Sequence, residues 1–209
     1  MYRTVSLLMV GEMEKRKGEN TREHVLESAM GLINTRGYGA TSINDIIEVT
    51  GVKKGNLYFH FSNKEDLVYA MIEKARDDYN SFLLSRVKGD TALEKLYSIF
   101  DSIFRYHRAR KFEGGCIFGN IALELGDANP RFAQLVRSIF DGWAKMFIPL
   151  IEAAQREGSI RAVLEPAPLS RHMVAALEGA VMLSRLSKRA ADFRDCINSL
   201  KALVEVAGD

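Results

Sequence analysis

Residues 41–64 read TSINDIIEVTGVKKGNLYFHFSNK, and this stretch decides the fold. Thr41 is placed to cap a short helix, because its hydroxyl can accept a hydrogen bond from a free backbone N–H one turn on. The three isoleucines that follow it fall on one apolar face of that helix. Gly51 comes after the last apolar turn, and a residue without a Cβ atom lets the chain reverse sharply there. The stretch therefore predicts a helix, a tight turn and a second short helix.

The second helix is expected to begin near Val52 and to divide its side chains between two faces. Leu57 and Phe61 are expected to pack inward together with Val52. The outward face gathers cationic, amide and phenolic groups: Lys53, Lys54, Asn56, Tyr58 and His60. Such groups bind phosphate oxygens and the edges of bases, so this face has a composition typical of a surface that meets DNA.

This segment resembles the helix-turn-helix domain of the TetR family of bacterial transcriptional repressors. The residues that match the family's pattern, in order and nearly in register, are Thr41, Ile46, Gly51, Val52, Gly55, Leu57, Tyr58, His60, Phe61, Lys64 and Leu67. The resemblance implies an N-terminal three-helix DNA-binding domain followed by a larger C-terminal helical domain for effector binding and dimerisation. Two residues depart from the pattern: Ile47 replaces a small residue, and Lys53 replaces a small hydroxyl residue. The operator preference of the family is therefore not carried over.

The resemblance also assigns DNA-binding roles within the segment. The residues expected to meet phosphates are Thr41, Lys54, Tyr58, His60 and Lys64. Those expected near base edges are Lys53, Gly55 and Asn56, and Ser42 completes the expected DNA-binding set. Asn56 is suited to read adenine, because its amide can form a bidentate pair with that base.

The composition indicates a folded helical protein. Of 209 residues, 47% are hydrophobic, 27% are charged and four are proline. No run of about 18 apolar residues occurs and β-branched alternation is scarce, so we expect an all-α chain with no membrane partner. The net charge of +2 is too small to indicate nucleic-acid binding by itself. Cations are concentrated locally instead, where they can neutralise phosphates, at Lys53, Lys54 and Lys64 and in the run Lys15, Arg16 and Lys17.

Two domains are expected. Residues 1–18 are interpreted as an extension or disordered arm, 19–66 as the DNA-binding domain, and 67–209 as the ligand-binding and dimerisation domain, with a linker helix at about 64–85. The first helix is expected from Asn20 or Thr21 to Arg36, which leaves Met13 as an alternative start to Met1. Further helices are expected near residues 91–110, 116–126, 130–157, 167–188 and 192–206.

The second domain shows no catalytic constellation, so we expect neither an enzyme nor a cofactor. Its sequence has no serine elbow, no phosphate-cradling glycine loop and no closely spaced Cys and His ligands. Glu124 and Asp127 could bind a metal with His107, but solvated helix charges and a buried histidine are the commoner arrangement. No metal site is predicted.

Apolar and aromatic side chains are abundant in this domain, and they fit either a packed core or a cavity. Helical spacing alone does not distinguish the two. Because TetR-like proteins usually bind a small effector here, the resemblance favours a pocket for an apolar or aromatic small molecule. The residues expected to line it are Phe104, His107, Phe118, Phe140, Trp143, Phe147, Met173 and Leu177.

The last two expected helices have faces suited to pairing with a second copy of the chain. One carries small residues that permit close helix approach, and the other carries an apolar stripe. The expected interface residues are Ala176, Gly179, Ala180, Leu183, Phe193, Ile197, Leu200 and Val204. Packing within one chain is the alternative. A two-fold homodimer would present two recognition helices to double-stranded DNA with an inverted repeat.

These observations predict a cytoplasmic, ligand-responsive repressor that an effector releases from its operator. Cys116 and Cys196 are far apart in the sequence, which fits reduced thiols in a cytoplasm. The alternative is a small-molecule or redox sensor without a dedicated local operator, in which Cys116 lies at a helix N-terminus that lowers its pKa. An activator, or a DNA-binding protein without an effector, stays open as well.

Overall fold

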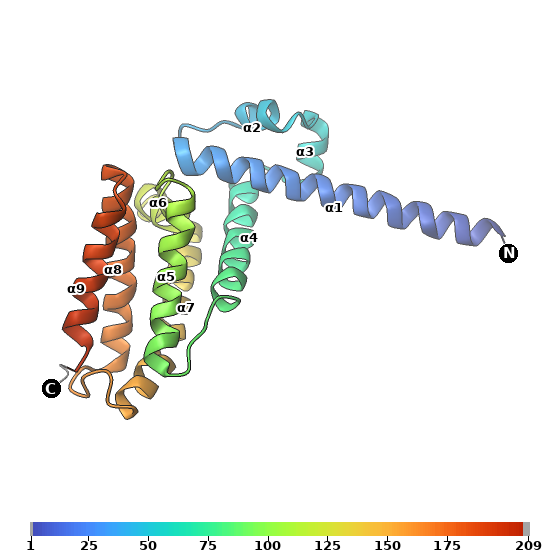
Figure 1. The fold of residues 1–209 in the computed structure, drawn as a ribbon. Coiled ribbons are helices and arrows are strands. Elements are labelled where there is room, and N and C mark those ends of the chain that lie inside the picture. The colour runs from blue at the N-terminus through green and yellow to red at the C-terminus, as the bar shows by residue number, and fades with distance from the viewer. Residues whose placement is uncertain (1, 207–209) are drawn as a thin grey trace. The chain divides into compact units, whose positions relative to one another are not determined.

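A computed structural model describes residues 2–206, and these fold into α-helices. The helices are α1 Tyr2–Arg36, α2 Ile43–Thr50, α3 Lys54–His60, α4 Lys64–Leu84, α5 Ala92–Ala109, α6 Ile117–Leu125, α7 Pro130–Arg156, α8 Pro166–Ser187 and α9 Ala190–Val204 (Figure 1). Within these residues the β-type pairing is limited to an isolated bridge between Ile160 and Glu205. The all-α prediction is confirmed.

Two compact units divide the chain, residues 1–75 and residues 76–209. The helix α4 begins in the first unit and ends in the second. The division therefore falls later than the boundary expected at residue 66. The reason is that Leu67, Met71 and Ala75 on the first half of α4 are buried, so these turns belong to the hydrophobic core of the first unit.

Helix α1 starts much earlier than expected. Residues 2–18, interpreted from the sequence as an extension or disordered arm, continue the same helix as residues 19–36. The stretch contains no proline, and its two glycines each cost a helix only about 1 kcal/mol relative to alanine. The side chains of Lys15, Arg16 and Lys17 lie outside the part of the chain whose side chains the structure describes.

The core of the first unit joins four helices. Val25, Leu26, Ala29 and Ile33 line the inner side of α1, at the spacing of one helical face. They are buried together with Ile46 of α2, Leu57 of α3 and the start of α4. This packing holds the short helices α2 and α3, which are too short to be stable alone.

The second unit is a bundle in which α7 contacts α5, α6 and α8, and α8 also packs along α9 (Figure 1). Its helices begin where the chain supplies caps. Thr91 and Glu94 form a capping box at the start of α5. The Asn129 side chain accepts hydrogen bonds from backbone N–H groups in the first turn of α7. The helix α7 continues past Pro149, which is exposed. The expected helices agree with α5–α9 to within two residues at each end.

Candidate functional site

The first helix of the predicted helix-turn-helix is capped by Ser42, not by Thr41. The Ser42 hydroxyl accepts a hydrogen bond from the backbone N–H of Asp45 at 3.1 Å, and the Asp45 carboxylate accepts the Ser42 backbone N–H at 2.6 Å. The Ser42 hydroxyl also donates to the Asp45 carboxylate, at 2.6 Å, and this bond together with the one from the Ser42 backbone holds the pKa of Asp45 below its ordinary value. Thr41 lies one residue too early for this role. Its side chain is fully buried, and its hydroxyl donates to the Gly37 carbonyl at 2.7 Å.

The turn between α2 and α3 is fixed from both sides. Gly51 adopts φ 66°, the left-handed conformation expected there, and its N–H donates to the Ile47 carbonyl at 2.9 Å. Thr50 donates its hydroxyl to the Ile46 carbonyl at 2.7 Å and accepts the Val52 N–H at 3.3 Å. The ring of His24 on α1 lies 3.1 Å from the Thr50 carbonyl oxygen. The end of α2 is therefore held against α1.

Helix α3 presents the polar face that the sequence predicts. Leu57 is fully buried on its inner side, and Tyr58 is 43% exposed. The other exposed members of the predicted set on this helix and its N-cap are Lys53, Lys54, Gly55 and Asn56. Lys53 stands at the N-cap of α3 and is exposed, so its ammonium can reach an external anion. These residues come together as one surface.

Three residues of the predicted DNA-binding set are placed differently. Thr41 is buried, so its side chain is not at the surface. Lys64 is half-buried, with its ammonium 4.0 Å from the centre of the Tyr38 ring. His60 is half-buried too, with its ring edge-on to that of Phe59 at 5.2 Å. These three side chains are therefore less exposed than the rest of the predicted set.

Phe59 is a candidate DNA contact that sequence reasoning missed. It is 81% exposed, the largest exposure among the aromatic side chains that stand out as exposed in the described residues. It lies three and four residues after Asn56 and Gly55, which places it on their side of α3. This helical spacing was the signal in the sequence that could have identified Phe59. An exposed phenylalanine on a helix in a major groove can contact the methyl group of thymine.

The second unit contains an enclosed cavity of about 20 Å³, space for roughly one water molecule. Three residues of the predicted pocket line it: Trp143, Phe147 and Leu177. The remaining lining residues were not predicted, and they are Tyr79, Leu83, Ile103, Val174 and Glu178. A surface groove of about 260 Å³ has two lining residues in common with this cavity, Val174 and Glu178. Phe140, which was predicted to line the pocket, lines this groove.

The other predicted pocket residues lie elsewhere. Phe118 packs edge-on against Trp143, with ring centres 5.3 Å apart, and Met173 is fully buried in the core. Phe104 lines a separate surface depression between α5 and α9. His107 is buried on α5, where burial and then the nearby Arg110 charge lower its pKa to about 4. We therefore assign these four side chains to packing or to another surface.

Polar side chains from two helices line the cavity, and a thiol at the start of a third helix bonds to one of them. Tyr79 on α4 and Glu178 on α8 line the cavity, and Cys116 caps α6. The thiol of Cys116 donates a hydrogen bond to the Glu178 carboxylate. Burial raises the pKa of Glu178 to about 7 despite that hydrogen bond, and burial also raises the pKa of Tyr79. Sequence reasoning missed Glu178 because an isolated glutamate on an amphipathic helix gives no signal of burial.

The proposed redox chemistry of Cys116 is disfavoured by this environment. The sequence suggested a lowered pKa at a helix N-terminus, but burial and then the Glu178 carboxylate raise the pKa of Cys116 well above its ordinary value. The expected direction was wrong because the helix N-terminus is enclosed. A thiol that stays protonated is a poor nucleophile toward oxidants. Cys116 and Cys196 are both free.

The apolar stripe predicted for a dimer interface is part of the core of one chain. Phe193, Ile197, Leu200 and Val204 on α9 are each at most 5% exposed, and Ala180 on α8 is fully buried. This is the alternative that helical spacing left open. Of the predicted interface residues, Ala176, Gly179 and Leu183 remain at least partly exposed. The larger apolar side chains exposed on these two helices are Met182, Leu186 and Leu203.

Comparison with known proteins agrees with this architecture. The family model of the bacterial regulatory proteins of the tetR family matches residues 25–71, and that of the tetracyclin repressor-like C-terminal domain matches residues 92–200. The second match alone spans more than half of the chain. The protein belongs to the TetR family.

Relatives of this TetR-family chain align over most of its length. An uncharacterized HTH-type transcriptional regulator of Lactococcus lactis subsp. lactis is 26% identical, covering 94% of this chain and 100% of its own. The HTH-type transcriptional repressor DhaR of Mycobacterium sp. (strain GP1) is 26% identical, covering 80% and 83%. A TetR transcriptional regulator from Chloroflexus aurantiacus J-10-FL superimposes with a TM-score of 0.83 at 31% identity, covering 92% of this chain and 100% of its own.

The TetR family places the chain among transcriptional regulators rather than enzymes. In residues 2–206 no helix is both long and apolar enough to cross a membrane. The candidate metal ligands Glu124, Asp127 and His107 do not form a cluster. No group of three or more His, Cys, Asp or Glu side chains suited to a metal occurs among the described residues.

Proposed function

We propose that this TetR-family regulator is a repressor that binds an inverted-repeat operator as a homodimer and is released by a small-molecule effector. The observation that carries the proposal is the exposed face of α3. There, Lys53, Lys54, Asn56 and Tyr58 surround a helix whose other side is buried. Exposed cations and amides on a helix that follows a tight turn are what reading a major groove requires.

The homodimer is supported by the apolar surface that α8 and α9 leave exposed. Met182 is 53% exposed, Leu186 76% and Leu203 63%. Neighbouring positions on the same helices are small or half-buried, including Ala176 and Gly179, which would allow two helices to approach closely. A two-fold dimer is suited to an inverted repeat, whose half-sites lie about 34–36 Å apart or a multiple of that distance.

Effector control is supported by the course of α4. This helix begins at Lys64, directly after the DNA-binding helices, and its second half supplies Tyr79 and Leu83 to the cavity wall. An effector that displaces these side chains would act on the same helix that begins directly after the DNA-binding helices. Release requires that the effector bind the DNA-incompetent state more tightly, typically by about 1–3 kcal/mol.

The test is a titration of the protein against a labelled duplex from the DNA upstream of its own gene, with an unrelated duplex as comparison. Lys54→Ala should weaken binding to both duplexes and lower the slope of log K against log salt by about one. The matched control is Lys145→Ala, which removes an exposed cation from α7 in the other unit. Equal effects of the two substitutions would contradict the assignment of α3 as the DNA-binding surface.

A further inference from the structure

Glu178 is an acidic side chain set into an apolar wall. It lies where the enclosed cavity and the surface groove share a wall with Val174. Its carboxylate accepts a hydrogen bond from the Cys116 thiol. A Cβ atom on Gly119 would lie 2.8 Å from the Oε2 atom of Glu178, so the missing side chain of Gly119 makes room for the carboxylate. Residues at the start of α6 therefore bound the space that the Glu178 carboxylate of α8 occupies.

No cation of the protein compensates this carboxylate. Among the described residues Glu178 takes part in no ion pair, and the enclosed cavity is lined by no Lys, Arg or His. The titratable groups that face it are Tyr79 from α4 and Cys116 at the start of α6. Asp141 of α7 and Arg171 of α8 also line the surface groove. A carboxylate that is buried without a cation is costly, so the site favours a ligand that brings one.

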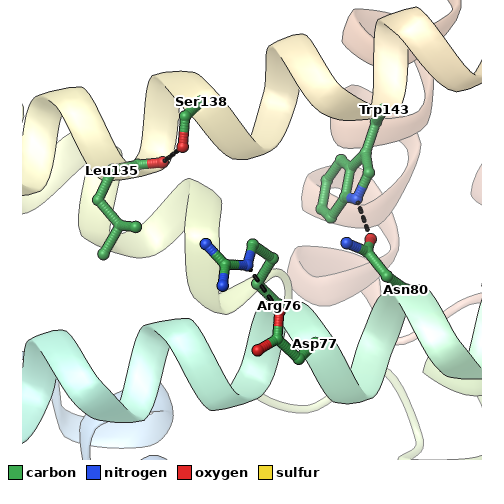
Figure 2. A network of polar contacts seen from close by, with 6 residues as sticks. All are labelled: Arg76, Asp77, Asn80, Leu135, Ser138 and Trp143. Carbon is green, nitrogen blue, oxygen red and sulfur yellow. Dashed lines mark hydrogen bonds and ion pairs between the residues drawn. The ribbon is translucent and has the colours of Figure 1, made fainter.

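Aromatic rings surround the same space. Tyr79 and Trp143 line the cavity with ring centres 5.4 Å apart, and Phe140 stands 5.3 Å from Trp143 in the groove. Figure 2 shows the indole N–H of Trp143 directed at the Asn80 side-chain oxygen, at 3.0 Å, so this polar atom is already bound. Trp143 therefore offers carbon surface to a ligand, and the faces of such rings attract cations.

The aromatic cluster already holds one cation at its outer end. The guanidinium of Arg110 lies 3.7 Å from the centre of the Tyr106 ring, and Tyr106 packs edge-on against Tyr79 at 5.2 Å. Cation–π contact is thus an interaction that this cluster makes within the protein itself. In the cavity, the rings of Tyr79 and Trp143 and the Glu178 carboxylate are lining residues together, and no Lys, Arg or His lines it.

We propose that the effector is an organic cation, whose protonated amine or quaternary ammonium group pairs with the Glu178 carboxylate beside Tyr79 and Trp143. Its apolar body lies in the groove against Phe140 and Ala144, because the enclosed cavity, at about 20 Å³, has no room for it. This identification of the ligand class rests on the proposed function, in which the second unit binds an effector. The charge of this carboxylate disfavours an anionic effector at the same place.

The test uses charged and uncharged ligands of equal size. Trp143 is the one tryptophan of the chain and lines the cavity, so its emission reports binding. Titrations at pH 8 compare benzylammonium with benzyl alcohol, and 2-phenylethylammonium with 2-phenylethanol, because both members of each pair donate hydrogen bonds. The ammonium ligands should bind at least about tenfold more tightly, the factor that corresponds to one strong charged hydrogen bond.

Glu178→Gln should abolish this preference. The amide has the same size, so affinity for the ammonium ligands should fall about tenfold, to that of the alcohols, while alcohol binding stays unchanged. Gly119→Ala provides a second variant, since its Cβ displaces the carboxylate without removing it, and it should weaken ammonium binding alone. The control, Glu152→Gln, removes an exposed carboxylate from α7 and should leave every affinity unchanged.

Three results would overturn the proposal: equal affinity for ammonium and alcohol, an undiminished preference in Glu178→Gln, or no ammonium binding with Kd below roughly 10 mM. A parallel arm with bound operator DNA separates this proposal from the proposed function. Ammonium binding that depends on Glu178 but leaves DNA bound would contradict effector control and support the cation site. Release of DNA by the alcohols alone would support effector control and contradict the cation site.

Discussion

Replacing Glu178 by Gln should stabilise the second unit, and increasingly so as pH rises. Burial holds the pKa of this carboxyl at about 7 in the folded protein, against an ordinary value of 4.5. Between these two values the unfolded chain has lost the proton while the folded chain retains it. The free energy of unfolding therefore falls as pH rises from 4.5 to 7 and levels off above. Glutamine does not ionise, so the variant escapes this loss.

The size of the effect follows from the separation of the two pKa values. The folded and unfolded pKa values differ by about 2.5, and each pKa unit corresponds to about 1.4 kcal/mol. The variant should therefore be more stable than the original protein by about 3 kcal/mol at pH 8 and by only about 1 kcal/mol at pH 5. His107 acts in the opposite sense. Its pKa of about 4 lies below the ordinary 6.5, so its contribution to stability is complete above pH 6.5 and is lost as pH falls toward 4. Because both proteins contain His107, its contribution cancels in their difference.

Urea unfolding followed by the emission of Trp143 measures this difference. The single tryptophan belongs to the second unit, so the signal reports the part of the chain that contains Glu178. Both proteins are compared at one protein concentration, since dimerisation would add to the apparent stability. Glu152→Gln, which removes an exposed carboxylate of α7, serves as control and should show no trend with pH. A stability difference for Glu178→Gln that stays constant between pH 5 and 8 would refute the reasoning.

Four further substitutions have expected outcomes. Ser42→Ala removes the capping box of α2 and should lower the free energy of unfolding of the first unit by about 1 kcal/mol, measured by urea unfolding followed by circular dichroism. Asn56→Ala should relax preference at one base pair by about 1–3 kcal/mol in competition titrations with single-base operator variants, and Phe59→Ala should do the same only at a thymine. Leu186→Glu should convert the dimer to monomer in light scattering, because it places a charge on an apolar surface.

The fold was predictable because its signals are local. The glycine at position 51 indicates the turn, because the backbone adopts a φ of 66° there. The helix starts of the second unit likewise follow capping residues such as Thr91 and Asn129. The cap of α2 was misplaced by one residue, since Thr41 and Ser42 are adjacent and both can cap. What decides between them is the burial of Thr41, and burial depends on contacts distant in the sequence.

The candidate sites were predictable to different degrees for the same reason. The exposed face of α3 follows from helical spacing around Leu57, which is a local pattern. The cavity depends on which helices pack side by side, so apolar spacing found Trp143 and Leu177 but also included Met173, which is core. The α9 stripe of Phe193 and Ile197 shows the same ambiguity, because an inner face and a partner-facing face have the same period.

Glu178 connects the stability of the second unit with its proposed response to ligands. Its ionisation lowers stability when the site is empty, because the protein supplies no cation, and a bound cation would remove that loss. Part of the binding free energy of a cationic effector would therefore come from relief of an existing cost. Neutral ligands gain nothing from this relief, so the same residue that destabilises the empty protein would discriminate between ligands. Glu178→Gln should then lose ligand preference and gain stability together, and a variant that changed only one of the two would separate these effects.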